Sequence, residues 1–228
     1  MSQAGRIPTC IGIIPDGNRR WAKANGLSSL EGHHAGYQKF KEVVHWAFER
    51  GVSTVIFYAF STENWRREPK EVKYLMKMLE WVLSSEVDEL HTEGIRVRVI
   101  GDIRSLSDRL QELVRKTEAK TKDNANGTVA ILLSYGGRKE IMEALKKARL
   151  DPSLAAEESF AKLLWTEELP DPDLVLRTSG VKRLSNFLIW QTAYSELFFS
   201  DTLWPDFSRP EFEAVLAEFA ERERRFGA

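Results

Sequence analysis

Residues 11–21 have the sequence Ile11-Gly12-Ile13-Ile14-Pro15-Asp16-Gly17-Asn18-Arg19-Arg20-Trp21. The apolar run is typical of a buried strand, and the Asp-Gly-Asn turn that follows it leads into a helix. Such a helix start directs N–H groups and partial positive charge at an anion, and Arg19 and Arg20 suit phosphate oxygens. Asp16 would repel a phosphate unless Mg²⁺ joined the two. It could equally cap the helix, and this segment alone leaves both interpretations open.

Length and composition limit the class of protein. The 228 residues are 43% hydrophobic and 29% charged with a net charge of -1, which fits one folded domain spanning residues 1–228. This balance argues against disorder and against general polyanion binding, so we expect no nucleic-acid partner. The single cysteine excludes an internal disulfide framework and fits a reducing compartment. With no long apolar stretch and no signal-peptide core, we expect a cytoplasmic protein without stable membrane insertion, limited to transient contact with a membrane surface.

Apolar strand-like segments alternate with amphipathic helical patterns along the chain. The alternation predicts an α/β fold with a central, mostly parallel sheet flanked by helices. Asp151–Ala156 is predicted to be a surface loop. The expected strands are Cys10–Pro15, Thr54–Phe60, Ile95–Ile100, Val129–Ser134 and Leu174–Arg177, and the expected helices include the patterns beginning at Phe40 and at Val72 together with Ile103–Lys122, Arg138–Leu150 and Pro210–Arg225.

Polar groups follow four of the expected strands. Besides the segment after Ile14, they occur in residues 61–67, 134–138 and 177–186. Gly-Gly and Ser-Gly pairs are also ordinary turn signals, so any one cluster has a structural explanation. Since ligands bind at the carboxyl ends of parallel strands, four such clusters favour a phosphate-handling site.

Absent motifs narrow the chemistry further. The chain has no G-x-G-x-x-G, no G-x-x-x-x-G-K-[ST], no H-E-x-x-H and no cysteine cluster. Dinucleotide, nucleoside-triphosphate and zinc sites of the usual kind therefore lose support. The His33-His34 pair is more typical of a cap or a surface position, although one of the two could donate to a phosphate.

Several ordered blocks resemble the cis-prenyltransferase family, to which undecaprenyl diphosphate synthase belongs. The resemblance extends from about Ile11 to the end of the chain. Its blocks are Asp16–Ala22, Gly32–Gly36, Tyr58–Trp65, Tyr135–Arg138, Arg177–Gly180, Arg183–Phe187, Trp190–Gln191, Tyr194–Leu197, Trp204–Phe207 and Arg222–Gly227.

The resemblance implies an α/β fold with a hydrophobic tunnel and the joining of an allylic prenyl diphosphate to a second isoprenoid diphosphate. Asp16 and Asn64 would be catalytic, and Asp16 would bind Mg²⁺ with help from Glu196. Apolar residues such as Leu75, Met76, Leu79 and Leu83 would line the tunnel, although helical apolar stripes are more often plain core. The resemblance also implies a homodimer and the following substrate-binding residues: Gly17, Asn18, Arg19, Arg20, Trp21, His33, Ser61, Trp65, Arg67, Arg177, Arg183, Ser185, Arg225 and Gly227.

Two departures from the pattern of long-chain family members concern the product. Ser29 stands where those enzymes have an arginine that contacts the allylic diphosphate, and Val181 stands where they have a glutamate. A small branch of the fold, which makes lavandulyl-type products by head-to-middle coupling, departs at the same places. These residues favour short-chain irregular coupling with dimethylallyl diphosphate as acceptor, and the alternative is regular cis elongation with isopentenyl diphosphate.

Other classes have less support. A non-catalytic partner subunit would be expected to lack Asp16 and the arginines at 177 and 183, which are present. Relatives that transfer a prenyl group to a different kind of acceptor would be expected to lose the second diphosphate site. A hydrolase with Asp16 as nucleophile would need a second aspartate where Asn18 stands.

Overall fold

The computed structural model describes residues 6–222, in which six parallel strands form one sheet with the order β3-β4-β2-β1-β5-β6. The expected α/β fold with a central parallel sheet is confirmed. The strands are β1 (Cys10–Ile14), β2 (Thr54–Ser61), β3 (Ile95–Ile100), β4 (Gly127–Tyr135), β5 (Leu174–Arg177) and β6 (Glu196–Phe199).

Strand β1 lies at the centre of the sheet and is buried along its whole length. Its two neighbours, β2 and β5, connect to opposite halves of the sheet, which creates a crevice at its carboxyl end. Because both faces of the sheet are covered, its central strands are continuous apolar runs.

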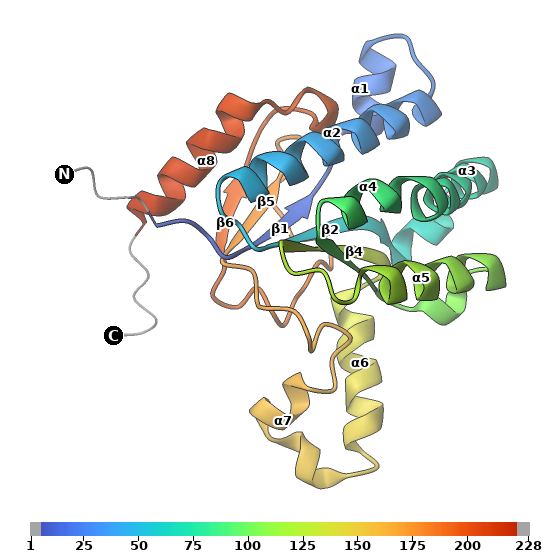
Figure 1. Cartoon of the computed structure of the whole chain (residues 1–228), viewed down its shortest axis with the longest axis vertical. Coiled ribbons are helices and arrows are strands. Elements are labelled where there is room, and N and C mark those ends of the chain that lie inside the picture. The colour runs from blue at the N-terminus through green and yellow to red at the C-terminus, as the bar shows by residue number, and fades with distance from the viewer. Residues whose placement is uncertain (1–5, 223–228) are drawn as a thin grey trace.

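Helices α2 (Ser29–Glu49) and α8 (Arg209–Glu221) cover one face (Figure 1). Residues such as Phe40, Val44 and Phe212 pack there against Ile11 and Ile13. The opposite face packs against Phe187, Leu188 and Trp165, near α6 (Gly137–Ala148) and the short α7 (Glu157–Ala161).

A continuous helical segment packs on the same face of the sheet as α2. It comprises α3 (Pro69–Trp81), a π-helical turn at Val82–Glu86 and α4 (Val87–Thr92). Helix α5 (Asp108–Thr121) packs beside it through Leu110 and Val114. None of the helices within residues 6–222 combines the length and the apolar character needed to cross a bilayer.

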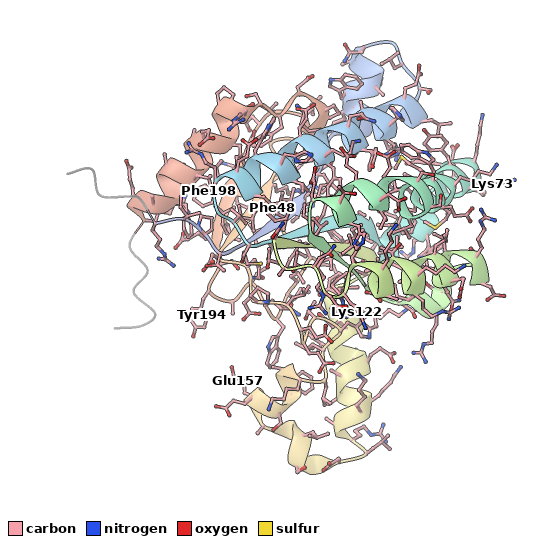
Figure 2. The ribbon with its side chains drawn as sticks, viewed as in Figure 1. Phe48, Lys73, Lys122, Glu157, Tyr194 and Phe198 are labelled. Atoms are coloured by element: carbon pink, nitrogen blue, oxygen red, sulfur yellow. The ribbon has the colours of Figure 1, made fainter. Side chains whose placement is uncertain are left out.

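Some expected boundaries were wrong. Strand β6 was not expected, because four residues at a sheet edge give little periodic signal. The residue just before the strand, Tyr194, is 70% exposed, and its side chain projects from the ribbon (Figure 2). The helix expected from Ile103 begins at Asp108 instead, because Ser107 caps it. The expected loop at Asp151–Ala156 contains a 3-10 turn at Pro152–Ala155.

Helix α1 (Asn18–Ala24) packs unusually closely on α2. A Cβ atom built on Gly32 would lie 2.3 Å from the backbone oxygen of Asn18, and one on Gly36 would lie 2.5 Å from the Asn18 Oδ1 atom. The G-x-x-x-G spacing of the two glycines therefore gives α2 a flat face on which α1 and its polar residues rest.

We predict that Gly32→Ala destabilises the fold by about 1–3 kcal/mol, because the new methyl group would press against backbone rather than a flexible side chain. This loss should exceed the gain of about 1 kcal/mol that alanine offers over glycine in a helix. Urea unfolding measures the change. His34→Ala, at an exposed position of the same helix, is the control and should change stability by less than about 0.5 kcal/mol.

Candidate active site

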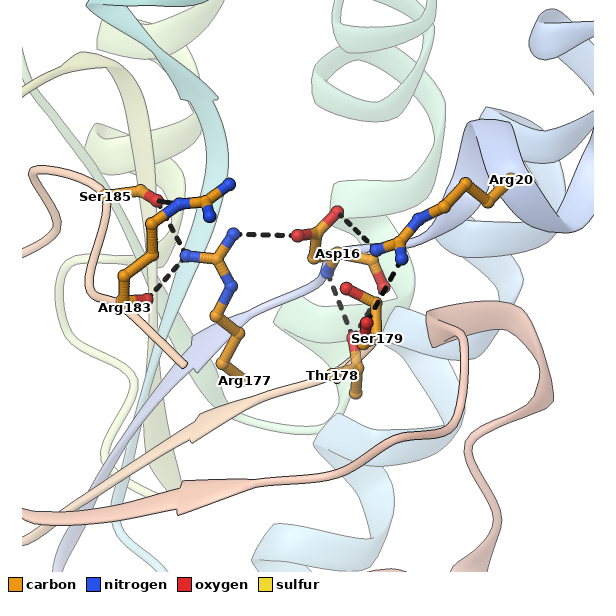
Figure 3. Close-up of polar contacts among 7 residues, drawn as sticks. All are labelled: Asp16, Arg20, Arg177, Thr178, Ser179, Arg183 and Ser185. Carbon is orange, nitrogen blue, oxygen red and sulfur yellow. Dashed lines mark hydrogen bonds and ion pairs between the residues drawn. The ribbon is translucent and has the colours of Figure 1, made fainter. Parts of the chain in front are cut away.

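The carboxyl ends of β1 and β5 meet at Asp16 and Arg177. The two strands pair with Ile14 opposite Arg177, so Asp16, two residues further on, lies beside the arginine side chain. Arg177 Nη2 donates to Asp16 Oδ2 at 2.7 Å (Figure 3). The Thr178 hydroxyl accepts from the Asp16 backbone N–H at 3.0 Å and donates to the Asp16 carbonyl oxygen at 2.7 Å. These contacts fix the Asp16 backbone and carboxylate.

Arg177 is only 4% exposed and is held from the opposite side as well. Its Nη1 donates to the Arg183 carbonyl oxygen at 2.5 Å and to the Ser185 hydroxyl at 2.7 Å, while Arg183 Nε donates to the same hydroxyl at 3.1 Å. Arg177 Nε is buried without a hydrogen-bond partner among the described residues. These contacts hold the Arg177 guanidinium rigidly beside Arg183 and make this part of the site cationic.

Asp16 also faces Arg20, whose Nη2 lies 3.6 Å from Asp16 Oδ1. Burial by itself would raise the pKa of Asp16, but the hydrogen bond and charge of Arg177, supported by Arg20, outweigh it and lower the pKa below its ordinary value. Asp16 is thus an anion at neutral pH. Within residues 6–222, no group of three or more converging histidine, cysteine or carboxylate ligands includes Asp16. A single ionised carboxylate fits Mg²⁺ held jointly by protein and substrate phosphates.

The turn between β1 and α1, together with the first residues of α1, carries three more of the expected binding residues. Gly17 has a φ of 118°, and a Cβ atom there would lie 3.0 Å from the Leu203 Cα atom, so this position requires glycine. Asn18 Oδ1 is buried without a hydrogen-bond partner in the part of the chain that the structure describes. Arg19 extends outward, with Nε 3.9 Å from Glu71 Oε2.

Two cavities meet at Asp16. The outer cavity, of about 820 Å³, is lined by four cationic side chains, those of Arg19, Arg20, Lys23 and Arg67, and by Ser29 among others. The inner cavity, of about 730 Å³, extends from Arg177 and Arg183 into the fold. The two cavities share Pro15, Asp16, Asn18, His33 and Arg67.

The inner cavity changes character with depth. Near Asp16 its wall carries Arg138, Arg177, Arg183 and Ser185, and further in it is lined by Phe40, Phe57, Leu75, Leu79 and Val82. Such a cavity suits a ligand with an anionic head and a hydrocarbon tail. Of the expected tunnel residues, Leu75 and Leu79 line it, whereas Met76 packs against the neighbouring core.

Comparison with known proteins identifies the family. The model described as putative undecaprenyl diphosphate synthase matches residues 14–227. The chain belongs to this family. It is a prenyltransferase of the prenyl diphosphate synthase type, as the resemblance implied.

Named relatives agree with this assignment. The ditrans,polycis-undecaprenyl-diphosphate synthase ((2E,6E)-farnesyl-diphosphate specific) of Salmonella paratyphi A is 45% identical over 95% of this chain and 89% of its own length. An isoprenyl transferase of Aquifex aeolicus is 42% identical over 97% of this chain and 96% of its own length.

Solved structures include lavandulyl diphosphate synthase from Lavandula x intermedia in complex with dimethylallyl diphosphate. It has a TM-score of 0.93 and 34% identity, with coverage of 97% of this chain and 99% of that chain. A probable undecaprenyl diphosphate synthase from Campylobacter jejuni has a TM-score of 0.83 and 33% identity, with coverage of 98% of this chain and 100% of that chain.

His33 in this prenyltransferase is a buried member of a polar cluster between the two cavities. Its Nε2 lies 3.0 Å from Glu71 Oε1, which also accepts from Arg67 Nη1 at 3.0 Å. Glu71 was missed by the sequence reasoning, although Arg67 and Glu71 have the i, i+4 spacing of a helical ion pair. The carboxylate holds both neighbours at the cavity wall.

Asn186 is a second residue that sequence reasoning missed. Its Oδ1 accepts from the Arg138 N–H at 2.9 Å, and its Nδ2 donates to Glu63 Oε1 at 2.9 Å. Asn186 thereby ties the arginine cluster to α6 and to the 3-10 turn Thr62–Arg66. It directly follows Ser185 in a recognised block, which was the available signal.

The expected residues around Asn64 separate into two groups. Asn64 and Ser61 line the inner cavity, and Asn64 Oδ1 accepts from the Ser61 N–H at 3.2 Å. Trp21 and Trp65 line neither cavity: their indole N–H groups donate to Asp206 Oδ1 at 2.6 Å and to Ser134 Oγ at 2.9 Å. In this structure each tryptophan therefore forms a hydrogen bond with a neighbouring segment of the chain instead of facing a cavity.

The structure does not bring Glu196 to Asp16. Glu196 begins β6 and pairs with Leu174, whereas Asp16 follows the opposite, carboxyl end of β1. Glu196 instead accepts from Arg222 Nη1 at 2.9 Å. Within one chain the two carboxylates therefore lie toward opposite ends of the parallel strands, and the expected role of Glu196 in holding Mg²⁺ stays a prediction. Arg225 and Gly227 lie outside the described residues.

His33 gives a pH prediction. Burial lowers its pKa below the ordinary value of 6.5, with Arg67 acting in the same direction and Glu71 opposing. In the window below pH 6.5 the unfolded chain binds the proton more readily, so stability should fall as pH falls. Urea unfolding between about pH 7.5 and about pH 5.5 should show this fall, and it should be shallower in His33→Gln. An unchanged slope would contradict the assignment; the exposed neighbour substitution His34→Gln is the control.

Proposed function

We propose that this prenyltransferase carries out regular cis elongation, joining an allylic prenyl diphosphate to isopentenyl diphosphate with release of pyrophosphate. The observation that carries the proposal is the position of ionised Asp16 between two arginine-lined cavities, one of which becomes apolar with depth. The sequence had favoured irregular coupling. Relatives named as undecaprenyl diphosphate synthases, at 44–45% identity, support the regular alternative better.

The allylic diphosphate would lie at the outer cavity, where Arg19, Arg20 and Arg67 offer charge-assisted hydrogen bonds. Its hydrocarbon tail would enter the inner cavity. Asp16 would hold Mg²⁺ together with the diphosphate. When bound, the ion would draw negative charge onto the departing pyrophosphate.

The second diphosphate would bind Arg177, Arg183 and Ser185, on the other side of Asp16. This arrangement would orient the acceptor's double bond toward the allylic carbon, near Asn64. A carbon–carbon bond would form as the donor's carbon–oxygen bond breaks, and the acceptor would lose a proton to the departing pyrophosphate as its new double bond forms.

Irregular head-to-middle coupling is the second candidate. Ser29 lines the outer cavity as the first residue of α2, so the arginine expected in long-chain enzymes is missing from the donor site. The similarity to lavandulyl diphosphate synthase, at a TM-score of 0.93, concerns a protein solved with dimethylallyl diphosphate. Because of these two observations, the product analysis described below also tests for irregular coupling.

We also propose a cytoplasmic homodimer. Strand β6 leaves one edge of the sheet open, and Leu197 on it is 36% exposed, which suits burial by a second copy. Arg225 and Gly227 would then reach the partner's site, as the family resemblance implies, and transient contact with a membrane surface would release long products.

Product identification tests the proposal. The protein is incubated with Mg²⁺ and dimethylallyl, geranyl or farnesyl diphosphate, each with and without isopentenyl diphosphate, and products are identified by mass spectrometry. Regular elongation predicts products that grow by five-carbon units and require isopentenyl diphosphate. A ten-carbon product from dimethylallyl diphosphate alone would instead support irregular coupling.

Asp16→Asn should reduce turnover by at least about a hundredfold, because it removes the charge that holds Mg²⁺ while keeping the side-chain shape. Steady-state kinetics measure the loss, and circular dichroism checks the fold. Asp123→Asn, at an exposed carboxylate just beyond α5, is the matched control. Turnover within about threefold of the parent would contradict the role of Asp16.

The two diphosphate sites predict opposite kinetic effects. Arg183→Ala should raise the KM of isopentenyl diphosphate by about tenfold or more and leave the KM of the allylic donor nearly unchanged, since a hydrogen bond to a charged group is worth about 1.5–3 kcal/mol. Arg20→Ala should raise the donor's KM instead. Equal effects on both substrates would mean that the two sites are assigned incorrectly.

A further inference from the structure

A third, small cavity lies beyond the inner cavity. This end cavity, of about 20 Å³, lies between α2 and α4 and reaches Lys41, His45 and Glu89. It shares four lining residues with the inner cavity, namely Tyr37, Phe40, Val82 and Ile131. These four residues form the partition between the two spaces.

The order of lining residues along two helical segments shows that the cavities lie in one line. Along α2, His33 borders both the outer and inner cavities, Tyr37 and Phe40 stand at the partition, and Val44 and His45 line only the end cavity. The α3–α4 segment repeats this order.

In the α3–α4 segment, Leu75 and Leu79 line the inner cavity, Val82 stands at the partition, and Leu83 and Leu90 line only the end cavity. A hydrocarbon tail that grows inward from Asp16 therefore reaches the partition before it can reach the end cavity.

Tyr37 is the one partition residue with a polar anchor. Its hydroxyl donates to Glu86 Oε2 at 3.0 Å, and Lys41 Nζ donates to the same oxygen at 2.9 Å. Burial raises the pKa of Tyr37, so the hydroxyl keeps its proton and remains a donor. The ring of Trp81 packs edge-on against Tyr37, with centroids 5.4 Å apart. The ring of Tyr37 is consequently held in place from two sides.

A π-helical turn interrupts this helix wall at the partition. Val82, which begins the turn, lines the partition, and Glu86, which ends it, meets the Tyr37 hydroxyl. Single π-turns inside helices often mark functional sites.

We propose that the ring of Tyr37 is the stop that sets the maximum length of the prenyl chain. The proposal rests on the proposed function, in which the inner cavity takes the hydrocarbon tail. A tail that displaced the ring would break the hydrogen bond to Glu86. It would then lie against Lys41, Glu86 and Glu89, which oppose an apolar chain.

Binding of linear alkyl diphosphates of increasing length tests the proposal without any reaction. Calorimetry with Mg²⁺ should show affinity rising about fourfold per methylene while the tail fills the inner cavity. Beyond the length at which the tail meets Tyr37, the gain should fall below about twofold per methylene. Tyr37→Ala, which joins the two cavities, should move this plateau to longer chains.

Two variants separate the ring from other effects. Tyr37→Phe keeps the ring and should keep the plateau of the parent. Tyr74→Ala removes a tyrosine from α3 that lines none of the three cavities, and it should also keep that plateau. Equal plateaus in Tyr37→Ala and the parent, or equal lengthening in Tyr37→Phe and Tyr37→Ala, would overturn the proposal.

If Tyr37→Ala does not fold, Val82→Phe tests the same stop from the opposite wall. It narrows the approach to the partition and should move the plateau to shorter chains, whereas an unchanged plateau would overturn the proposal.

Product lengths from farnesyl and isopentenyl diphosphates, measured by mass spectrometry, should shift in the same directions as the plateaus. A parent protein that shows the plateau but makes no product with isopentenyl diphosphate would contradict regular elongation and leave the stop standing. An active parent whose product length does not change in Tyr37→Ala would overturn the stop alone.

Discussion

The ion pair between Asp16 and Arg177 is the interaction on which the site depends. It joins the carboxyl ends of two neighbouring parallel strands, and Arg20, Thr178, Arg183 and Ser185 each contact one of its members. Arg177 holds the carboxylate ionised, and the carboxylate fixes the direction of a buried guanidinium whose other side binds Ser185 and the Arg183 carbonyl. Removing the Asp16 side chain would leave the buried Arg177 guanidinium without its anionic partner, which is far more costly than losing a surface pair.

The segment that follows β5 has several strained backbone conformations. Ser179, Ser185, Asn186 and Leu188 all have positive φ, a conformation that is unfavourable for residues other than glycine. Asn186 helps to hold the segment through its bonds to Arg138 and Glu63. Strain of this kind persists where the surrounding contacts over-determine the backbone, and here those contacts also connect the arginine cluster to the wall that carries Asn64.

The apolar depth of the fold has a different origin. Helix α2 and the α3–α4 segment stand on either side of a space above the sheet, and this space is not filled by core side chains. Phe40, Leu75 and Leu79 are hydrophobic at helical spacing in the same way as any core residue, so their pattern could not distinguish a cavity wall from a packed interior. Whether such residues line a cavity or fill a core depends on the volume left between the helices and the sheet, and this volume is set only when the fold packs.

The site residues divide in the same manner. The turn after Ile14 and the arginines at 177 and 183 could be assigned from the chain because strand ends in a parallel sheet converge at one edge. Glu71 and Asn186 could not, since their roles depend on side chains from other elements that reach them in space. The distance of Glu196 from Asp16 within one chain could not be predicted either, because a motif does not reveal at which end of its strand a residue lies.

By itself, the sequence determined the α/β class, the parallel sheet and the clustering of polar and cationic residues at its carboxyl ends, because strand and helix periodicity and turn residues are local properties. The tertiary structure alone decided that Asp16 is paired with Arg177, that His33 is buried against Glu71, and that the inner cavity ends at Tyr37. Those features are distances between elements far apart in the chain. They are fixed by packing, such as the close contact of α1 on the glycines of α2, and no local pattern encodes them.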